Sequence, residues 1–278
     1  MECESKKKGL TGFQLKYIAL ILMVMDHIYY FFNFTGKIPE WFSMFGRLSA
    51  PLFLFCVVEG FIHTHDRRKY FLRIYALSIG MGIFQYICLM YGVTRPDGFY
   101  PQNAILANFV ILLVILQGIV WIRDKKWCKG LVAIVLPMLY PYIAMAILSR
   151  VPSLGRIISL LHFTLLPMHS ALTDGGFTFI LFGIVLYLAR KNRKVQAISF
   201  AATVLILDIG MLYLMLPGVT VHQLVFQYYE WLEAFAAILI LFYNGERGKG
   251  SQKLFYWFYP AHVYVLFGLS CVLYGILR

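Results

Sequence analysis

Asp26 and His27 are adjacent residues of the kinds that acid–base and nucleophilic catalysis use, and they stand inside the apolar run 14–34. A neutral imidazole can accept a proton near pH 7 or attack an activated carbonyl. An ionisable side chain within a membrane span is costly and marks a functional position by default. Neighbouring residues point about 100° apart around a helix. We therefore expect Arg47 to pair with Asp26 and His27 to face a cavity; the alternative is a structural contact among the three without chemistry.

Glu59, His63 and Arg67 follow one another at four-residue spacing, which places them on one face of a helix. This face continues into a basic cluster made of Arg67, Arg68, Lys69 and Arg73. Such a cluster suits the phosphates of a cytoplasmic ligand; the alternative is a basic loop whose side chains only extend to the membrane surface. Because His63 and His65 are two residues apart and point to different sides of a helix, no metal site is expected.

Other ionisable groups also lie within apolar runs: Asp174, Asp208, Glu230, Glu233 and His262. In a continuous helix over 222–243, Gln223, Gln227 and Glu230 would share a face that Glu233 continues. A polar path of this kind suits a transporter as well as an enzyme. The sequence has no G-x-G-x-x-G, no P-loop, no G-x-S-x-G and no H-E-x-x-H. Any chemistry therefore belongs to the groups within the membrane.

The composition requires a membrane around these groups. Apolar and aromatic residues make up 60% of the 278 residues, mean hydropathy is +0.72, and only 14% are charged, against roughly a quarter in soluble domains. The net charge of +12 comes from short basic clusters between apolar runs, which is the pattern of cytoplasmic loops rather than of a nucleic-acid surface. We expect one membrane-embedded domain over residues 1–278, in the cell (plasma or inner) membrane, with no nucleic-acid partner.

The apolar runs predict an all-α, polytopic helical bundle of about nine transmembrane helices with a cytoplasmic N-terminus. The runs fall near 14–34, 48–64, 70–92, 104–122, 130–149, 171–189, 196–216, 222–243 and 254–276. With this topology 19 of the 25 Lys and Arg residues are cytoplasmic and six are not, as the positive-inside rule requires. His27 then lies roughly 20 Å from the cytoplasmic end of its helix.

One further apolar segment, 157–170, is shorter than these and contains His162, Pro167 and His169. If it crossed the membrane, every later basic loop would move to the outside. We therefore predict an interfacial or re-entrant helix on the external face. Pro137 and Pro141 are expected to kink the helix before it, which membrane helices tolerate where neighbouring groups bind the freed carbonyls.

Three ordered motifs in the N-terminal third resemble the TraX family of membrane proteins. They are LTGFQLKYIALILMVMDH, FGRLSAPLFLFCVVEGFIHT and DRRKYFLRIY, and the C-terminal LFYWFYPAHVYVL is similar to that family's closing helix. The family is named for an enzyme that N-acetylates a pilin subunit, and it resembles the wider acyltransferase-3 group. That group moves acyl units, typically from cytoplasmic acetyl-CoA, and has a membrane-embedded histidine at its centre.

The resemblance implies roles for individual residues. The counterpart of the family's D-H motif is Asp26-His27, that of G-R is Gly46-Arg47, and that of E-G-x-x-H is Glu59-Gly60 with His63. Burial would favour the neutral form of His27, and Arg47 could stabilise an oxyanion. The expected catalytic residues are His27, Asp26, Arg47 and Glu59. The expected coenzyme-binding residues are His63, Arg67, Arg68, Lys69 and Arg73.

The sequence thus predicts an acyl-CoA-dependent acetyltransferase. Its co-substrate would be acetyl-CoA, its acceptor a peptide N-terminus, another amine or a hydroxyl group, and no metal would take part. His27 would act as a general base or a transient acyl carrier. Two alternatives remain: a transporter for a small solute or lipid-linked substrate, and a non-catalytic membrane subunit of a secretion or conjugation apparatus.

Overall fold

The computed structural model describes residues 8–169 and 175–277, and the side chain of Gln252 is not described. Within these ranges every regular element is a helix, and extended pairing is limited to an isolated bridge between Leu10 and Tyr243. The predicted all-α class is confirmed. Asp174, one of the predicted intramembrane charges, lies outside the described residues.

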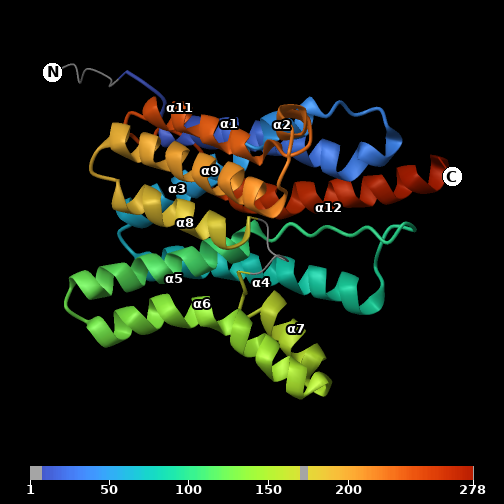
Figure 1. Ribbon diagram of the computed structural model, residues 1–278, viewed down its shortest axis with the longest axis horizontal. Helices are drawn as coiled ribbons and strands as arrows, with labels where there is room; N and C mark the ends of the chain where they lie inside the picture. Colours follow the sequence, from blue (N-terminus) through green and yellow to red (C-terminus); the bar gives the residue numbers. More distant parts are fainter. Residues whose placement is uncertain (1–7, 170–174, 278) are drawn as a thin grey trace. The chain divides into compact units, whose positions relative to one another are not determined.

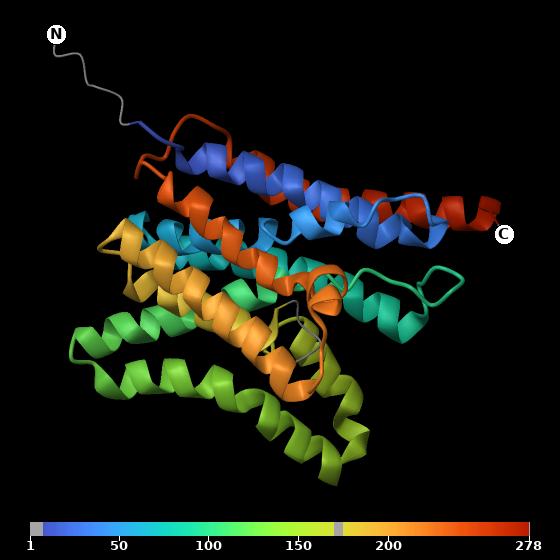
Figure 2. The ribbon, with the colours of Figure 1, turned by 45° about the horizontal axis from the view of Figure 1, so that its top comes forward.

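Figures 1 and 2 show the helices in chain order. Their bounds are α1 (Gly12–Phe32), η1 (Asn33–Thr35), α2 (Trp41–Gly46), α3 (Ser49–His63), α4 (Arg67–Tyr91), α5 (Ile105–Arg123), α6 (Trp127–Arg150), η2 (Pro152–Leu154), α7 (Gly155–Phe163), α8 (Gly176–Leu188), α9 (Arg193–Met215), α10 (Val221–Phe226), η3 (Tyr229–Phe235), α11 (Ala236–Leu241) and α12 (Gln252–Leu277).

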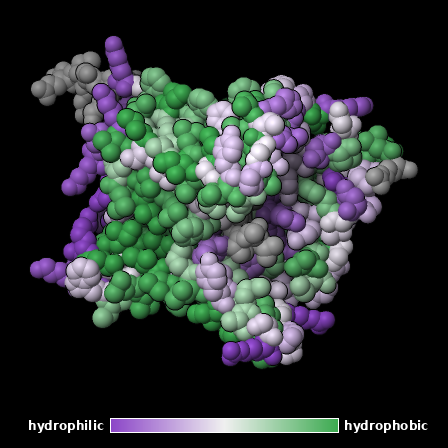
Figure 3. All heavy atoms as spheres, in the orientation of Figure 1, coloured by the Kyte–Doolittle hydropathy of each residue, from purple (hydrophilic) through white to green (hydrophobic). Residues whose placement is uncertain are grey.

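Seven helical segments of the described chain are long and apolar enough to cross a membrane. They are Gly12–Thr35, Trp41–His63, Arg67–Tyr91, Ile105–Arg123, Trp127–Arg150, Arg193–Met215 and Lys253–Leu277. Each coincides with a predicted span. The exposed surface is also what a lipid-embedded protein needs, since Figure 3 shows hydrophobic residues over much of the visible face and the most hydrophilic ones mainly toward its edges. The protein is therefore a multi-pass membrane protein.

Two predicted spans differ from these seven. The one near 171–189 appears as α8, an apolar helix of 13 residues. The prediction of one helix over 222–243 is wrong, because this stretch is divided into α10, η3 and α11. Its break is stabilised by the indole of Trp231, whose Nε1 donates to the Leu224 carbonyl at 3.0 Å. Gln223, Gln227 and Glu230 consequently do not share a helix face.

Within the predicted segment 157–170, residues 157–163 belong to a short helix, α7, of nine residues, and residue 170 lies outside the described residues. At 1.5 Å per residue it is only about 14 Å long, less than half of the hydrocarbon core. The helix before it, α6, continues through Pro137 and Pro141, and Figure 2 shows it curved. Pro141 lacks the N–H that would bond to residue 137, and the adjacent Met138 carbonyl accepts a hydrogen bond from His169 Nε2 at 3.0 Å.

Contacts between residues divide the chain into two units. Unit 1 comprises residues 1–59 and 185–255, and unit 2 comprises residues 60–184 and 256–278. Unit 1 contains α1, α2, α9, α10, η3, α11 and most of α3. Unit 2 contains α4, α5, α6, α7, most of α8 and most of α12.

At one end of unit 1, four helix termini come together. The stretch before α1 pairs with the chain after α11, through Leu10 N–H to Phe242 O at 2.7 Å and Gly12 N–H to Glu246 O at 2.8 Å. The ring of Tyr243 contacts that of Phe55, near the middle of α3, with centroids 5.3 Å apart. The Arg193 guanidinium, at the start of α9, lies 4.6 Å from the Tyr243 ring centroid. The starts of α1 and α9 therefore lie beside the end of α11, and the start of α9 also lies beside α3.

Candidate functional site

Asp26 and Arg47 are joined in unit 1 through the hydroxyl group of Ser43. Ser43 Oγ donates to Asp26 Oδ1 at 3.1 Å, and Arg47 Nη2 donates to Ser43 Oγ at 3.3 Å. The guanidinium also lies 5.5 Å from the ring centroid of buried Tyr229, at the start of η3. Arg47 Nε is buried without a hydrogen-bond partner. The structure thus brings Asp26 and Arg47 together, with a serine between them.

Gly46 allows this approach of α2 to α1. A Cβ atom at this position would collide with the Cβ atom of Asp26 and press against its carboxylate. Only a glycine lets the backbone of α2 come so close to the acidic side chain. The G-R pair of the sequence therefore has two linked tasks, since Gly46 provides the contact and Arg47 provides the charge.

Further carboxyl groups extend this site. Arg47 interacts electrostatically with Glu230 and Glu233 of η3 as well as with Asp26, and Asp208 of α9 interacts with both glutamates. Asp208 Oδ2 is buried without a hydrogen-bond partner, whereas Glu230 is exposed. We call Asp26, Ser43, Arg47, Asp208, Glu230 and Glu233 the Arg47 cluster. Its carboxyl groups outnumber its guanidinium, so the cluster has an excess of negative charge unless protons or a cationic group compensate it.

His27 is also buried in unit 1, with 6% of its surface exposed. Its ring contacts those of Tyr30 and Phe31, at centroid distances of 6.3 and 6.1 Å, on the same helix. It follows Asp26 directly, so its backbone is adjacent to the Arg47 cluster while its side chain leaves α1 in another direction. The two side chains thus leave α1 in different directions, as adjacent residues of a helix must, and that His27 faces a cavity stays a prediction.

Glu59 belongs to a different part of unit 1. Glu59 is ten residues, or about 15 Å, further along α3 than Ser49, the first residue of that helix, which follows Arg47 by two positions. Its Oε1 atom accepts a hydrogen bond from Arg193 Nη1 at 3.3 Å. The Arg193 guanidinium in turn lies 5.0 Å from the Phe55 ring centroid and also donates to Gln196. Glu59 thus pairs with α9 at the opposite end of unit 1 from the Arg47 cluster.

The five predicted coenzyme-binding residues all belong to unit 2, at the end of α3 and the start of α4. His63, Arg68, Lys69 and Arg73 are exposed. Arg67 already interacts with Phe61, because its guanidinium lies 4.6 Å from the Phe61 ring centroid and its Nε donates to the Phe61 carbonyl at 3.4 Å. The Asp66 carboxylate caps α4 by accepting a hydrogen bond from the Lys69 backbone N–H at 3.0 Å. This bond to Lys69 lowers the pKa of the Asp66 carboxyl group.

Ser43, Tyr229 and Arg193 are the residues that the sequence did not identify. Ser43 and Arg47 are four residues apart, a spacing that indicates contact on a helix. The sequence could therefore have predicted Ser43 as a partner of Arg47. No sequence pattern distinguishes Arg193, because it is one of four similar cations in the basic segment 190–194. Among residues 8–169 and 175–277, no group of three His, Cys, Asp or Glu side chains is arranged to hold a metal ion.

The fold and the site define a class of protein, a polytopic helical membrane protein with acidic, basic and imidazole groups buried between its helices. More particularly, the chain belongs to the TraX protein family, whose model matches residues 11–270. It is also 29% identical over 277 residues to "Probable fimbrial assembly protein FimC, serogroup H1" of Dichelobacter nodosus, covering 94% of this chain and 96% of that protein. No solved structure matches the chain. The predicted family is confirmed.

Proposed function

We propose that this protein is a membrane-embedded acetyltransferase that transfers an acetyl group from cytoplasmic acetyl-CoA to the N-terminal amine of a fimbrial subunit. The observation that carries the proposal is the burial of His27 at the position that follows Asp26 of the Arg47 cluster on α1. An imidazole supplies a base near neutral pH, and a surplus of carboxylates suits an acceptor that arrives as an ammonium ion. The relationship to a protein named for fimbrial assembly supports a fimbrial acceptor, and a hydroxyl acceptor is the variant of the same chemistry.

In the proposed reaction the acceptor ammonium group loses a proton to His27, and the nitrogen of the resulting amine attacks the thioester carbonyl carbon. A C–N bond forms, the C–S bond breaks, and coenzyme A leaves as a thiolate that takes up the second proton lost by the nitrogen. Arg47 would stabilise the oxyanion of the tetrahedral intermediate. Glu230, the exposed member of the Arg47 cluster, would give the released proton a route to solvent.

The donor side of the proposal rests on unit 2. Arg68, Lys69 and Arg73 are exposed near the start of α4. The two guanidinium groups would bind the coenzyme phosphates through paired hydrogen bonds, and the lysine would bind them as a single positive charge. Arg67 would contribute less, because it already interacts with Phe61. Glu59, paired with Arg193, is better suited to stabilise unit 1 than to touch the reacting atoms.

The test is acetyl transfer from radiolabelled acetyl-CoA to a peptide with the fimbrial N-terminus, using purified protein in lipid nanodiscs. His27→Gln keeps a polar side chain but removes the base, and we expect at least about a hundredfold loss of rate. His222→Gln is the matched control, because His222 is exposed on α10. Full activity of His27→Gln would refute the assignment of His27, and no transfer by the unchanged protein to any amine or hydroxyl peptide would refute the enzyme.

A non-catalytic subunit of a fimbrial assembly apparatus is the second candidate, favoured by the name of the relative. For that function the Arg47 cluster would stabilise the fold or bind a partner helix. A deletion strain complemented with His27→Gln separates the two. Normal fimbriae carrying an unmodified subunit favour the enzyme, whereas normal fimbriae with no acetylation in the wild type favour the assembly subunit.

A further inference from the structure

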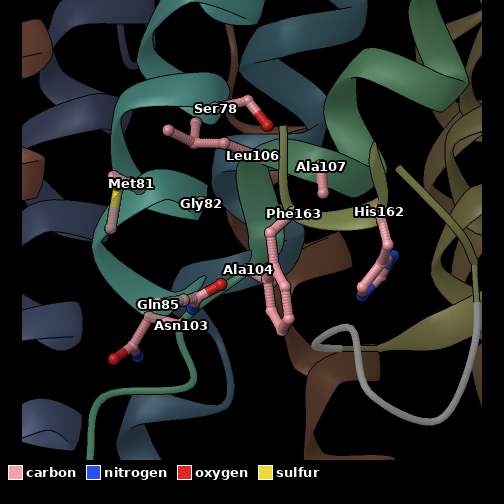
Figure 4. Close-up of a pocket in the computed structure, with 10 residues that line it drawn as sticks. All are labelled: Ser78, Met81, Gly82, Gln85, Asn103, Ala104, Leu106, Ala107, His162 and Phe163. Carbon is pink, nitrogen blue, oxygen red and sulfur yellow. The ribbon is translucent and has the colours of Figure 1, made fainter. Parts of the chain in front are cut away.

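Unit 2 contains a small polar cavity that takes no part in the proposed acetyl transfer. It has a volume of ≈ 20 Å³ and is lined by α4, the start of α5 and the end of α7. Its polar lining consists of Ser78, Gln85, Asn103 and His162 (Figure 4). None of its lining residues carries an acidic or a lysine or arginine side chain.

The cavity exists because α7 packs end-on against α4. Gly82 of α4 contacts the Phe163 carbonyl at the end of α7 so closely that a Cβ atom would collide with it. Nearby, the hydroxyl of Tyr75 donates to the Leu165 carbonyl at 2.8 Å. These two contacts fix the C-terminal end of α7, and with it His162, beside α4.

Two of the lining side chains are buried with hydrogen-bonding capacity unused in the described chain. Gln85 is 5% exposed, and its amide makes no hydrogen bond to any described residue. His162 is 8% exposed, and its Nδ1 accepts from Met168 N at 3.3 Å. Burial lowers the pKa of His162, so the ring is neutral at pH 7 and carries its proton on Nε2. Nε2–H is therefore a donor without an acceptor among the described residues.

The N-terminus of α5 adds further donors. Its N-cap is Ala104, which lines the cavity and has no side-chain oxygen with which to cap the first N–H groups. The N-terminal end of a helix of this length, 19 residues, also has a partial positive charge. The cavity thus combines a helix N-terminus, an amide, a hydroxyl and an imidazole N–H, while no carboxylate is present to repel an anion.

We propose that this cavity is a binding site for a small carboxylate. Its hydrogen-bond donors suit the two oxygens of such a group, and the partial positive charge at the N-terminus of α5 favours an anion over an ammonium or metal ion. Its volume admits one small group or a water molecule and excludes a nucleotide, so the acetyl-CoA donor does not bind here. On the predicted topology it lies toward the external ends of α4 and α5, on the side away from the cytoplasmic basic cluster.

Binding of ¹³C-labelled acetate to the protein in nanodiscs, followed by saturation-transfer NMR, tests this site. We expect saturable binding whose dissociation constant rises about tenfold or more in Gln85→Leu, since each lost hydrogen bond to an ion costs that much. His162→Phe is expected to act in the same direction. Gln117→Leu is the matched control, because Gln117 lies on α5 outside the cavity lining and about 15 Å further along the helix than Ala107.

Acetamide, of the same size but neutral, distinguishes a carboxylate site from a general carbonyl site. Weaker binding of acetamide than of acetate supports the proposal, and equal or tighter binding overturns it. Absence of saturable acetate binding to the unchanged protein overturns it as well, as does equal affinity in the wild type, Gln85→Leu and His162→Phe. Thermal unfolding of each variant identifies any that fail to fold. None of these results depends on acetyl transfer.

Discussion

At the scale of single residues, the site in unit 1 depends on how closely α2 approaches α1. Asp26, Ser43 and Arg47 lie within hydrogen-bond distance in series, and the hydroxyl between the two charges removes the need for their direct contact. A polar group inside an apolar medium is tolerated when such partners are present. The contact in turn rests on the absence of a side chain at position 46.

We expect Gly46→Ala to destabilise the protein by about 1–3 kcal/mol, because the added methyl group collides with the Asp26 side chain. Acetyl transfer should fall with it, since Arg47 would be displaced. Thermal unfolding in detergent and the transfer assay measure the two effects. Gly210→Ala is the control: nothing lies within 4 Å of a Cβ there, and removing a helical glycine should be neutral or stabilise by about 0.5–1 kcal/mol. An equal response of both variants would contradict the close contact.

The sequence could identify the charged members of this site but not its geometry. Ionisable residues in apolar runs stand out, so Asp26, His27 and Arg47 were found by type alone. That Asp208 interacts with Glu230 and Glu233 depends on the packing of α9 against η3, which no local pattern encodes. The sequence also could not predict the partner of Glu59. Arg193 differs from its basic neighbours in that it faces Phe55 and Tyr243, and this depends on the fold.

At the scale of elements, the Glu59–Arg193 pair joins the end of α3 to the start of α9. The side chains are 10% and 26% exposed, and two aromatic rings flank the guanidinium. Breaking a buried pair leaves a charge without its partner, which costs more than making the pair contributes. The pair links α3 to α9 through two residues that are 134 positions apart in sequence.

Arg193→Met should therefore destabilise the protein by about 1–3 kcal/mol, below the range for fully buried pairs because a quarter of Arg193 is exposed. Glu59→Gln should cost about as much, and the double variant should cost less than the sum. Chemical denaturation of the four proteins gives the coupling. Lys194→Met, which removes an adjacent exposed cation, is expected to change little. Additive effects of Arg193→Met and Glu59→Gln would show that the two residues act independently.

A second link lies in unit 2, where Arg95 fixes the segment between α4 and α5. Arg95 is 3% exposed, its Nη2 donates to Asp97 Oδ2 at 2.8 Å, and its guanidinium lies 5.1 Å from the Tyr274 ring centroid of α12. The hydrogen bonds from Arg95 hold the pKa of the Asp97 carboxyl group below its ordinary value. Stability from this contact is complete above the ordinary Asp pKa, near 4, and is lost as pH falls through the lowered folded value.

Hydrogen exchange across 92–104 should show this directly. We expect protection to be constant from neutral pH down to about pH 5, once the intrinsic exchange rate is corrected for, and to decline below about pH 4 as Asp97 takes up a proton. Asp97→Asn should remove the acid-dependent part and lower protection at neutral pH. Asp124→Asn, at the exposed end of α5, is the control. An unchanged acid response in Asp97→Asn would assign that response to another group.

At the scale of the whole molecule, hydropathy and charge predicted most of the spans because burial in lipid acts on every long apolar helix alike. They failed over 222–243, where the apolar run is continuous but Trp231 bonds to the Leu224 carbonyl and ends the helix. A side-chain contact between residues seven positions apart thus overrides the hydropathy pattern. The contacts within unit 1 in turn restrict the topology, because residues in contact lie at one depth and the chain between them must cross the membrane an even number of times.

Glu59 and Arg193 are in contact, so the chain between them must cross the membrane an even number of times. The helices α4, α5 and α6 account for three crossings, and one more is required. The apolar α8 supplies it if α7, at nine residues, stays on the external side. Leu10 and Tyr243 are also paired, so the broken segment α10–η3–α11 must return the chain after α9. In unit 2, α4 and α12 run in the same direction, since Phe84 contacts Tyr264 and, beyond the end of α4, Arg95 contacts Tyr274. The count of nine crossings stays a prediction, and seven helices of the described chain are long and apolar enough to cross.

Cysteine labelling tests this topology with a reporter that the chain already contains. Cys128 is exposed at the start of α6, on the predicted cytoplasmic side, and Lys37 follows η1 on the predicted external side. With Cys3, Cys56, Cys88 and Cys271 replaced by serine, we expect a membrane-impermeant maleimide to label Cys128 only after the cells are permeabilised. In the same background with Cys128→Ser, Lys37→Cys should be labelled in intact cells. The opposite pattern would invert the orientation, place the basic clusters outside, and separate His63, Arg68 and Arg73 from any cytoplasmic coenzyme.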